Sequence, residues 1–519
     1  MAATVSIIPR PDFLVESAGI FVIGPSTTLG AAEGAEGSAR ILRARLRTAT
    51  GYELAAAPAM ESTISLEIDS ALPVSGYEIA VTSDRVLLKG GDAAGLFHAT
   101  QTFLQLCPPA VLRRSQTPTV EWVVPSVEIR DQPRFAWRGM LLDVSRHFFG
   151  RDSVFTLIDA LALHRLNVLH LHLTDDQGWR VQIERYPLLT EIGSWRANSV
   201  VDNDDTRPQG QEPVRDSAPH DGYFTQEDLR EIVAYAAERH ITVMPEIDIP
   251  GHSQAAIAAY PELGNGEERL EVWTNWGINE HILNVEESTI DFFKNVLDEV
   301  LEIFPSEYIH IGGDEVPKKE WRESATAQAR IRELGLRDED ELQSWVIGEF
   351  GRYLAERGRR LVGWDEILEG GLADGATVMS WRGTEGGIAA AEAGHDVVMA
   401  PDNDTYFHHR QTEDRSAEPP GADPVLTLQH AFEYDPMPSE LEGKAREHVL
   451  GAQCQMWTER VSSERQMHQM AFPRMCGFSE AVWRSGDPVP FVDFEERMRT
   501  HRLRLHAMGI DAFEGRPGV

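Results

Sequence analysis

The chain has 519 residues, of which 42% are hydrophobic and 25% are charged, a composition typical of a soluble globular protein of two or three domains. Its 48 Lys and Arg residues against 83 Asp and Glu residues give a formal net charge of −35. Such a charge disfavours nucleic acid and anionic membranes as partners, and it favours a neutral or cationic ligand.

The first residues, MAATVSIIPRPDF, show no basic stretch, apolar core or cleavage site of a secretory leader. No window approaches 18 unbroken apolar residues, so no membrane span is expected. A cytoplasmic protein is the simplest expectation, although a secreted chain whose leader had been removed would look the same. Three cysteines, an odd number in apolar surroundings, are expected to be free core thiols: Cys107, Cys454 and Cys476.

Residues 1–130 are predicted to form a small α+β supporting domain. Three segments alternate apolar and polar residues like strands with one solvated face: 64–68, 77–82 and 85–90. A helix follows over 92–107, with Asp92 as its N-cap and two prolines at its end. No catalytic pattern is visible in this part of the sequence.

Residues 131–519 are predicted to form a (β/α)₈ barrel. Short apolar strands are expected at eight places: 139–145, 168–174, 241–248, 308–312, 360–364, 377–382, 396–400 and 450–457. Helical patterns separate most of them, and strands that alternate with helices in this way favour a TIM barrel. The polar tract 198–219 is expected to be a long loop within the barrel.

Polar and aromatic residues follow every one of these strands, where a barrel enzyme carries its catalytic groups. In chain order the segments are DVSRH, LTDDQGW, PEIDIPGHS, GGDE, GWDE, SWRG, APDNDTYFHH and QMWTE. Eight polar strand ends on apolar strands indicate one large site, and therefore an enzyme.

Two adjacent acids, Asp314 and Glu315, are the strongest catalytic candidates. Gly312 and Gly313 precede them, which we interpret as room for a ligand to approach the backbone. Glycosidases that use two carboxylates hold them about 5 Å or more apart, across the scissile bond. Neighbouring residues reach that arrangement poorly, so one acid is expected to donate the proton and the other to do something else.

Three tryptophans fall at strand ends: Trp364, Trp381 and Trp457. One such residue could simply fill the barrel core, but three together suit the apolar faces of a pyranose ring. They favour a carbohydrate substrate.

Two histidines, His170 and His172, raise the alternative of a metal-dependent barrel hydrolase. They share one face of a strand and precede its end, so we expect core packing and neither a metal nor another cofactor. His252 lies after the third strand, where Asp175 and Glu315 could join it in a carboxylate–imidazole–carboxylate relay that tunes the proton donor.

The motifs DVSRHFF, HLHLTDDQGWR, PEIDIPGHSQA, HIGGDEV and GAQCQMWTE resemble, in order, those of the retaining β-N-acetylhexosaminidases of glycoside hydrolase family 20. The resemblance covers nearly the whole chain, including the small domain before the barrel. It implies that the substrate's own acetamido oxygen is the nucleophile and closes to an oxazolinium. Glu315 would then be the general acid and base, and Asp314 would orient the acetamido group.

The resemblance implies further roles by position. Arg146 would bind the C3 and C4 hydroxyls, Tyr406 would donate to the acetamido oxygen, and Glu459 would hold the C4 or C6 hydroxyl. Asp175 and His252 would form the outer relay, and Trp364, Trp381 and Trp457 would line the sugar subsite. His408 departs from the family pattern, which often has an acid or amide there, and this leaves the preference between gluco and galacto sugars open.

The sequence therefore predicts an exo-acting enzyme that removes terminal N-acetylglucosamine, with N-acetylgalactosamine as a second candidate, from chito-oligosaccharides or glycoconjugates. The partner is a small carbohydrate, and the protein is expected to be a monomer or a homodimer. Two alternatives remain open at this point: a metal-dependent barrel hydrolase, and a catalytically inactive barrel that only binds sugars.

Overall fold

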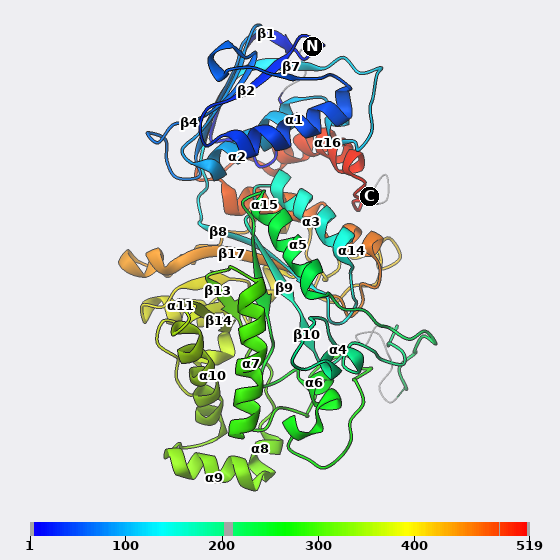
Figure 1. Ribbon diagram of the computed structural model, residues 1–519, viewed down its shortest axis with the longest axis vertical. Helices are drawn as coiled ribbons and strands as arrows, with labels where there is room; N and C mark the ends of the chain where they lie inside the picture. Colours follow the sequence, from blue (N-terminus) through cyan, green and yellow to red (C-terminus); the bar gives the residue numbers. More distant parts are fainter. Residues whose placement is uncertain (1–4, 202–210, 487, 516–519) are drawn as a thin grey trace.

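The computed structural model describes residues 5–201, 211–486 and 488–515, with a layer of sheet and helices above a barrel (Figure 1). The upper part contains a seven-stranded sheet in the order β1-β7-β5-β6-β4-β2-β3. Its strands are β1 (Phe13–Val22), β2 (Thr28–Ala31), β3 (Ala55–Ala56), β4 (Ile64–Ile68), β5 (Tyr77–Val81), β6 (Val86–Gly90) and β7 (Val123–Asp131). Helices α1 (Glu36–Thr50) and α2 (Ala93–Leu106) pack against this sheet.

The three predicted strands and the predicted helix of this part are confirmed as β4, β5, β6 and α2. Asp92 caps α2 as expected, because its carboxylate accepts a hydrogen bond from the Gly95 N–H at 2.7 Å. Almost every residue of α2 is buried, since the helix lies between the sheet and the barrel.

The sequence interpretation missed α1 and the strands β1, β2, β3 and β7. The apolar side of α1 consists of Ala39, Leu42, Leu46 and Ala49, which follow the helical spacing and are buried. Four arginines stand between them, so the apolar stripe is narrow and the helix was not recognised from periodicity.

Eight further strands close into a parallel barrel in the order β12-β13-β14-β15-β16-β17-β8-β9, and the predicted (β/α)₈ fold is confirmed. The eight strands are β8 (Trp137–Asp143), β9 (Val168–His172), β12 (Thr242–Glu246), β13 (Tyr308–His310), β14 (Arg360–Trp364), β15 (Thr377–Ser380), β16 (Val397–Met399) and β17 (Val449–Met456). The main outer helices are α3 (Arg151–Leu163), α5 (Gln226–Ala237), α7 (Glu287–Ile303), α10 (Glu339–Ala355), α11 (Glu385–Glu392) and α15 (Arg474–Trp483).

The register of the barrel puts four polar side chains in one row. Asp143 on β8 pairs with His172 on β9, which pairs with Glu246 on β12, which pairs with His310 on β13. All four residues are almost completely buried. This row lies just below the ends of the strands, where the candidate site begins.

A buried polar network joins the upper part to the barrel. Asp131, the last residue of β7, accepts hydrogen bonds from the Tyr77 hydroxyl at 2.7 Å and the Trp483 indole at 2.9 Å, and pairs with Arg165 at 3.2 Å. The C-terminal helix α16 (Phe491–Met508) also packs against this upper part (Figure 1), and Arg497 on it donates to the Ile7 carbonyl at 2.9 Å. The division of the chain at residue 130 stays a prediction, because α16 contacts both sides of it.

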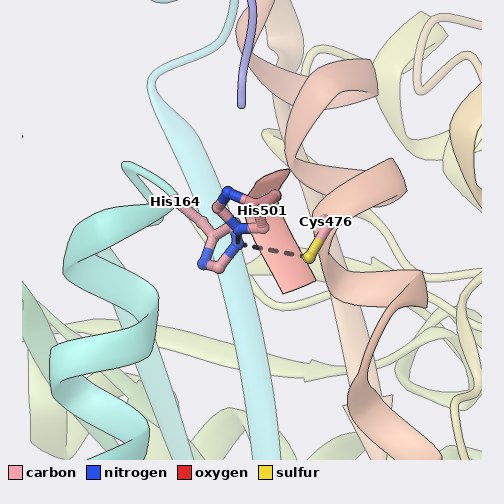
Figure 2. Close-up of side chains that lie close together, drawn as sticks. All are labelled: His164, Cys476 and His501. Carbon is pink, nitrogen blue, oxygen red and sulfur yellow. Dashed lines mark hydrogen bonds between the residues drawn. The ribbon is translucent and has the colours of Figure 1, made fainter. Parts of the chain in front are cut away.

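All three cysteines are free and buried, as predicted. Figure 2 shows Cys476 on α15 beside His164, which follows α3, and His501 on α16. The Cys476 Sγ lies 3.3 Å from His164 Nε2, which lies 2.9 Å from His501 Nε2. Three distant segments of the chain therefore meet in this cluster.

The predicted loop 198–219 is confirmed where it is described, with isolated bridges such as Val200 to Arg215, and residues 202–210 of it lie outside the described residues. Within the described ranges, no helix has both the length and the apolar character needed to cross a membrane.

Candidate active site

A cavity of about 250 Å³ opens at the carboxyl ends of the barrel strands. Its lining residues stand at or just after the carboxyl end of every barrel strand except β9. Ten of the eleven predicted site residues line it: Arg146, His252, Asp314, Glu315, Trp364, Trp381, Tyr406, His408, Trp457 and Glu459. The eleventh, Asp175, follows β9 and is buried directly beneath.

The loop after β13 presents the two adjacent acids. The strand ends at His310, and the chain then takes a left-handed conformation at Gly312 (φ 69°), Gly313 (φ 93°) and Glu315 (φ 47°). Glu315 is not glycine, so this conformation is strained and is held by its surroundings. This turn sets the directions of the two side chains, and both carboxylates face the ring of His252.

The reason that we inferred from the sequence for the presence of Gly312 and Gly313 was wrong. A Cβ at Gly312 would lie 1.7 Å from a carboxylate oxygen of Asp248, and one at Gly313 would lie 2.8 Å from the Ile367 side chain. The glycines make room for protein side chains beneath the loop, and Asp248 in particular, rather than for a ligand.

Asp314 and Glu315 have different environments. The Asp314 side chain is 13% exposed and that of Glu315 is 29% exposed. Burial, together with the charge of Glu315, raises the pKa of Asp314 to about 7. Among the described residues, none forms a hydrogen bond to the buried Oδ1 of Asp314. Asp314 can therefore hold or release a proton near neutral pH, and its free oxygen can accept a hydrogen bond from a ligand.

His252 connects both acids to the buried carboxylates below. Its Nε2 lies 3.4 Å from Glu315 Oε2 and 3.8 Å from Asp314 Oδ2, and its Nδ1 lies 3.3 Å from Asp175 Oδ1. Burial alone would lower the pKa of His252, but Asp175 and the other acids around it raise this pKa well above the usual value. The structure thus assembles the predicted relay from three different loops.

Arg146 lies over Trp457 and is anchored by three groups. It donates to Gln177 at 2.9 Å and pairs with Asp175 at 2.7 Å and Asp143 at 3.3 Å. A guanidinium has five N–H donors, so two remain for a ligand. Burial would lower the pKa of Arg146, but these carboxylates keep the group charged.

The three tryptophans and Tyr406 form the apolar wall of the cavity. The Trp364 indole donates to Glu246 at 2.9 Å, and the Trp381 indole donates to Glu366 at 2.9 Å. Trp381 and Tyr406 stack with an interplanar angle of 16°. Burial raises the pKa of Tyr406 well above 10, so its hydroxyl keeps its proton and can donate it in a hydrogen bond.

His408 and Glu459 also line the cavity, and the His408 ring lies beside that of Tyr406, with centroids 5.6 Å apart. The rings of His408 and His409 are in contact, with centroids 4.7 Å apart. Burial and the neighbouring His409 lower the pKa of His408 well below 6.5, so the ring is neutral. Its Nδ1 is buried and lacks a hydrogen-bond partner among the residues that the structure covers. Glu459 lies 4.0 Å from Arg146.

Sequence reasoning missed several groups around this cavity. Asp248 faces Asp314 from below, and burial and the charge of Asp314 raise the pKa of Asp248 well above its usual value. Burial likewise raises the pKa of Glu366 to about 8. Both are acids just past a strand end, and that position was the signal that could have identified them.

His170 and His172 are buried in the barrel, as expected, but His172 also contacts Asp175. The best-placed group for a cation at the cavity is Asp248, His252 and Asp314, whose nearest oxygen and nitrogen atoms lie within 4.8 Å of one another. Both nitrogens of His252 face carboxylates, which favours protonation rather than a free lone pair for a metal. This geometry favours an acid–base site.

Two family models match the chain: glycosyl hydrolase family 20, domain 2, over residues 4–132, and the catalytic domain of the same family over residues 135–486. A β-hexosaminidase of Porphyromonas gingivalis is 39% identical over 514 residues, which cover 98% of this chain. The chain spans 64% of the length of that protein.

Solved structures are similar over the full chain. An exo β-N-acetylglucosaminidase from Vibrio harveyi, in complex with N-acetylglucosamine, has a TM-score of 0.86 at 29% identity and covers 98% of this chain and 79% of its own. A β-N-acetylhexosaminidase from Streptomyces coelicolor has a TM-score of 0.83 at 30% identity and covers 99% of this chain and 98% of its own.

Proposed function

The chain belongs to glycosyl hydrolase family 20, and we propose that it is an exo-acting β-N-acetylhexosaminidase that removes terminal N-acetylglucosamine from chito-oligosaccharides or glycoconjugates. The membership confirms the resemblance that the sequence motifs predicted. The bound N-acetylglucosamine of the Vibrio harveyi structure supports this substrate class.

One observation carries the proposal: a small cavity that is lined both by aromatic side chains and by the Asp314–Glu315 pair. Tryptophan faces suit the apolar faces of a pyranose, and the polar groups of the lining can select its hydroxyls. A cavity of about 250 Å³ suits a single sugar at a chain end better than an internal unit of a polymer.

The proposed reaction is assisted by the substrate. The acetamido oxygen attacks C1 while the bond from C1 to the leaving oxygen breaks, and Glu315 gives its proton to that oxygen. The Asp314 carboxylate accepts a hydrogen bond from the acetamido N–H and balances the positive charge that develops on the nitrogen. The Tyr406 hydroxyl donates a hydrogen bond to the acetamido oxygen. Glu315 then takes a proton from water, whose oxygen attacks C1 while the bond from C1 to the acetamido oxygen breaks, which regenerates the acetamide and restores the β configuration.

The surroundings of the two acids support this division of work. Asp314 is deeply placed, with one oxygen free to bind the acetamide, whereas Glu315 is more exposed toward the leaving group. His252 and Asp175 would hold Glu315 in position and compensate its change of charge. Arg146, Glu459 and His408 would bind the outer hydroxyls of the sugar.

The test is hydrolysis of an aryl N-acetyl-β-glucosaminide by the wild type and by Asp314→Ala, with and without a thiazoline mimic of the oxazolinium. We expect turnover by the wild type, inhibition by the mimic, and a loss in rate on the order of 10²–10³ for the variant, because it lacks a group that stabilises developing charge. Asp152→Ala removes a carboxylate that is 94% exposed and serves as the matched control.

Each alternative predicts a different result. Turnover that the mimic does not inhibit would show that the acetamido group is not the nucleophile. Absence of turnover, with the mimic still bound, would indicate a barrel that only binds sugars. Loss of turnover on treatment with a strong chelator would indicate the metal-dependent alternative.

A further inference from the structure

The proton relay at the cavity continues into the barrel core. Beyond Asp175, the next group is His172, whose Nε2 lies 2.9 Å from Asp175 Oδ2. Its other nitrogen, Nδ1, lies 2.5 Å from Glu246 Oε2. Carboxylates and imidazoles therefore alternate through five residues from the core to the cavity: Glu246, His172, Asp175, His252 and Glu315.

His172 has a carboxylate oxygen at each ring nitrogen. A neutral imidazole has one N–H and one lone pair, so it cannot donate to both oxygens, whereas the imidazolium can. Burial would lower the pKa of His172, but Glu246 and Asp175 raise it well above the usual value. The geometry thus favours a buried positive charge between two negative ones.

Glu246 is surrounded by nitrogen atoms. Its Oε1 lies 2.9 Å from the Trp364 indole nitrogen and 2.9 Å from His310 Nδ1. Its Oε2 lies 2.5 Å from His172 Nδ1 and 3.1 Å from His170 Nε2. Burial would raise the pKa of Glu246, but the three histidines, His172 first, lower it well below its usual value.

Glu246 thereby connects the relay to the apolar wall. The Trp364 indole, which lines the cavity, is held by the same carboxylate that faces His172. The ring of His172 also contacts Trp457 edge to face, with centroids 5.0 Å apart. The charged groups that act on His172 from neighbouring elements include Asp175, Glu246, Asp248 and Asp314, and Arg146 pairs with Asp175.

We propose that His172 and Glu246 are positioning residues for this reaction, which keep a fixed charge behind Asp175 and hold Trp364 against the sugar. The inference rests on the proposed function, because it assigns the proton donor to Glu315. His172, the positive member of the pair, contacts Asp175, whereas Glu246 lies on the far side of His172. Along the relay, the positive charge is therefore closer to Glu315 than the negative charge is. Without that charge, the potential around Glu315 becomes more negative and its proton is held more tightly.

The other buried histidine cluster supplies a matched control. His164 is fully buried and has hydrogen-bond partners at both nitrogens, the Ala160 carbonyl at 2.7 Å and His501 at 2.9 Å. Figure 2 shows His164 beside His501. It follows the C-terminal end of α3, and the outer helices of a barrel run antiparallel to its strands, so His164 lies at the end of the barrel opposite the cavity. His164→Gln and His172→Gln are therefore the same change at equally buried sites, the first outside the extended relay and the second within it.

The experiment is the pH profile of kcat/KM for an aryl N-acetyl-β-glucosaminide with the wild type and both variants. For His172→Gln we expect the basic limb, which reports loss of the donor's proton, to move up by about half a pH unit, as one charge at moderate distance can do, with kcat lowered about tenfold. For His164→Gln the limbs should stay where they are in the wild type, whatever happens to stability.

A basic limb of His172→Gln that coincides with that of the wild type would overturn the proposal. Should that variant not fold, the ¹⁵N spectrum of histidine-labelled wild type tests the charge of His172 directly. The His172 signal is assigned as the one that shifts in the variant Glu246→Gln. We expect both nitrogens of His172 to carry protons at neutral pH, and a ring with one bare nitrogen would equally overturn it. Wild type without any turnover would instead refute the proposed function itself.

Discussion

Replacing Asp314 by Asn should make the protein more stable relative to the wild type as the pH rises. The pKa of Asp314 in the fold is about 7, above its usual value of 3.8, and burial is the main cause. The unfolded chain therefore releases this proton first. The contribution of Asp314 to stability is fully present below about pH 4 and is lost as the pH rises to about 7. Asn has no such proton, so its contribution does not change over this range.

The pKa difference sets the size of the effect. About three pH units at about 1.4 kcal/mol each give an upper limit of about 4 kcal/mol. Asp314 shares its surroundings with His252 and Asp248, whose own protonation adjusts with it. We therefore expect about half of this limit, or about 2 kcal/mol, between pH 4.5 and pH 7.5. For an unfolding entropy of about 2 cal/mol/K per residue, this corresponds to about 2 °C in the thermal midpoint.

The assay is thermal unfolding of the wild type and Asp314→Asn at pH 4.5, 5.5, 6.5 and 7.5, with the variant Asp152→Asn as a surface control. The informative quantity is the change with pH of the difference between midpoints, since the absolute offset also contains the different hydrogen bonding of an amide. The reasoning is refuted if the difference between Asp314→Asn and the wild type is constant across this range, or if it falls as the pH rises.

Four other results are expected. Glu315→Gln should lower kcat by about 10²–10⁴ for a poor leaving group and much less for a good one, because only a poor leaving group needs the proton; steady-state kinetics on two aryl substrates measure this. Tyr406→Phe should lower kcat by about 10²–10³ with little change in KM, since its hydroxyl acts on developing charge. Asp131→Ala should destabilise the fold by about 3–5 kcal/mol in urea unfolding, because Arg165 is left buried without its carboxylate. A strong chelator should leave the initial rate unchanged.

The barrel could be predicted from the sequence because its strands are short, apolar on both faces and separated by helices. The expected strand at 360–364 coincides with β14, and the other seven differ from the observed strands by a few residues at the ends. The cavity could be predicted for a related reason. A parallel barrel brings all its carboxyl strand ends to one side, so polar residues at those ends must meet.

The contacts beneath the cavity could not be predicted in the same way. Glu246 lies 74 residues from His172, and the two meet only because β9 and β12 pair in a particular register. A shift of one residue would turn every side chain of the strand to the other face. The role of Gly312 was misjudged for the same reason. Asp248 comes next to Gly312 only because β12 and β13 pair in the barrel.

The net charge of the chain and the charges around the cavity are separate properties. A net charge of −35 argues against anionic partners, yet it says little about the cavity, where acids are compensated locally. Asp175 faces Arg146, His172 and His252, and Glu246 faces three histidines. Asp314 lies 3.8 Å from His252, and burial still raises the pKa of Asp314 to about 7. A substrate that develops positive charge beside Asp314 would provide a further cationic partner, and this is the electrostatic reason to expect the acetamido nitrogen there.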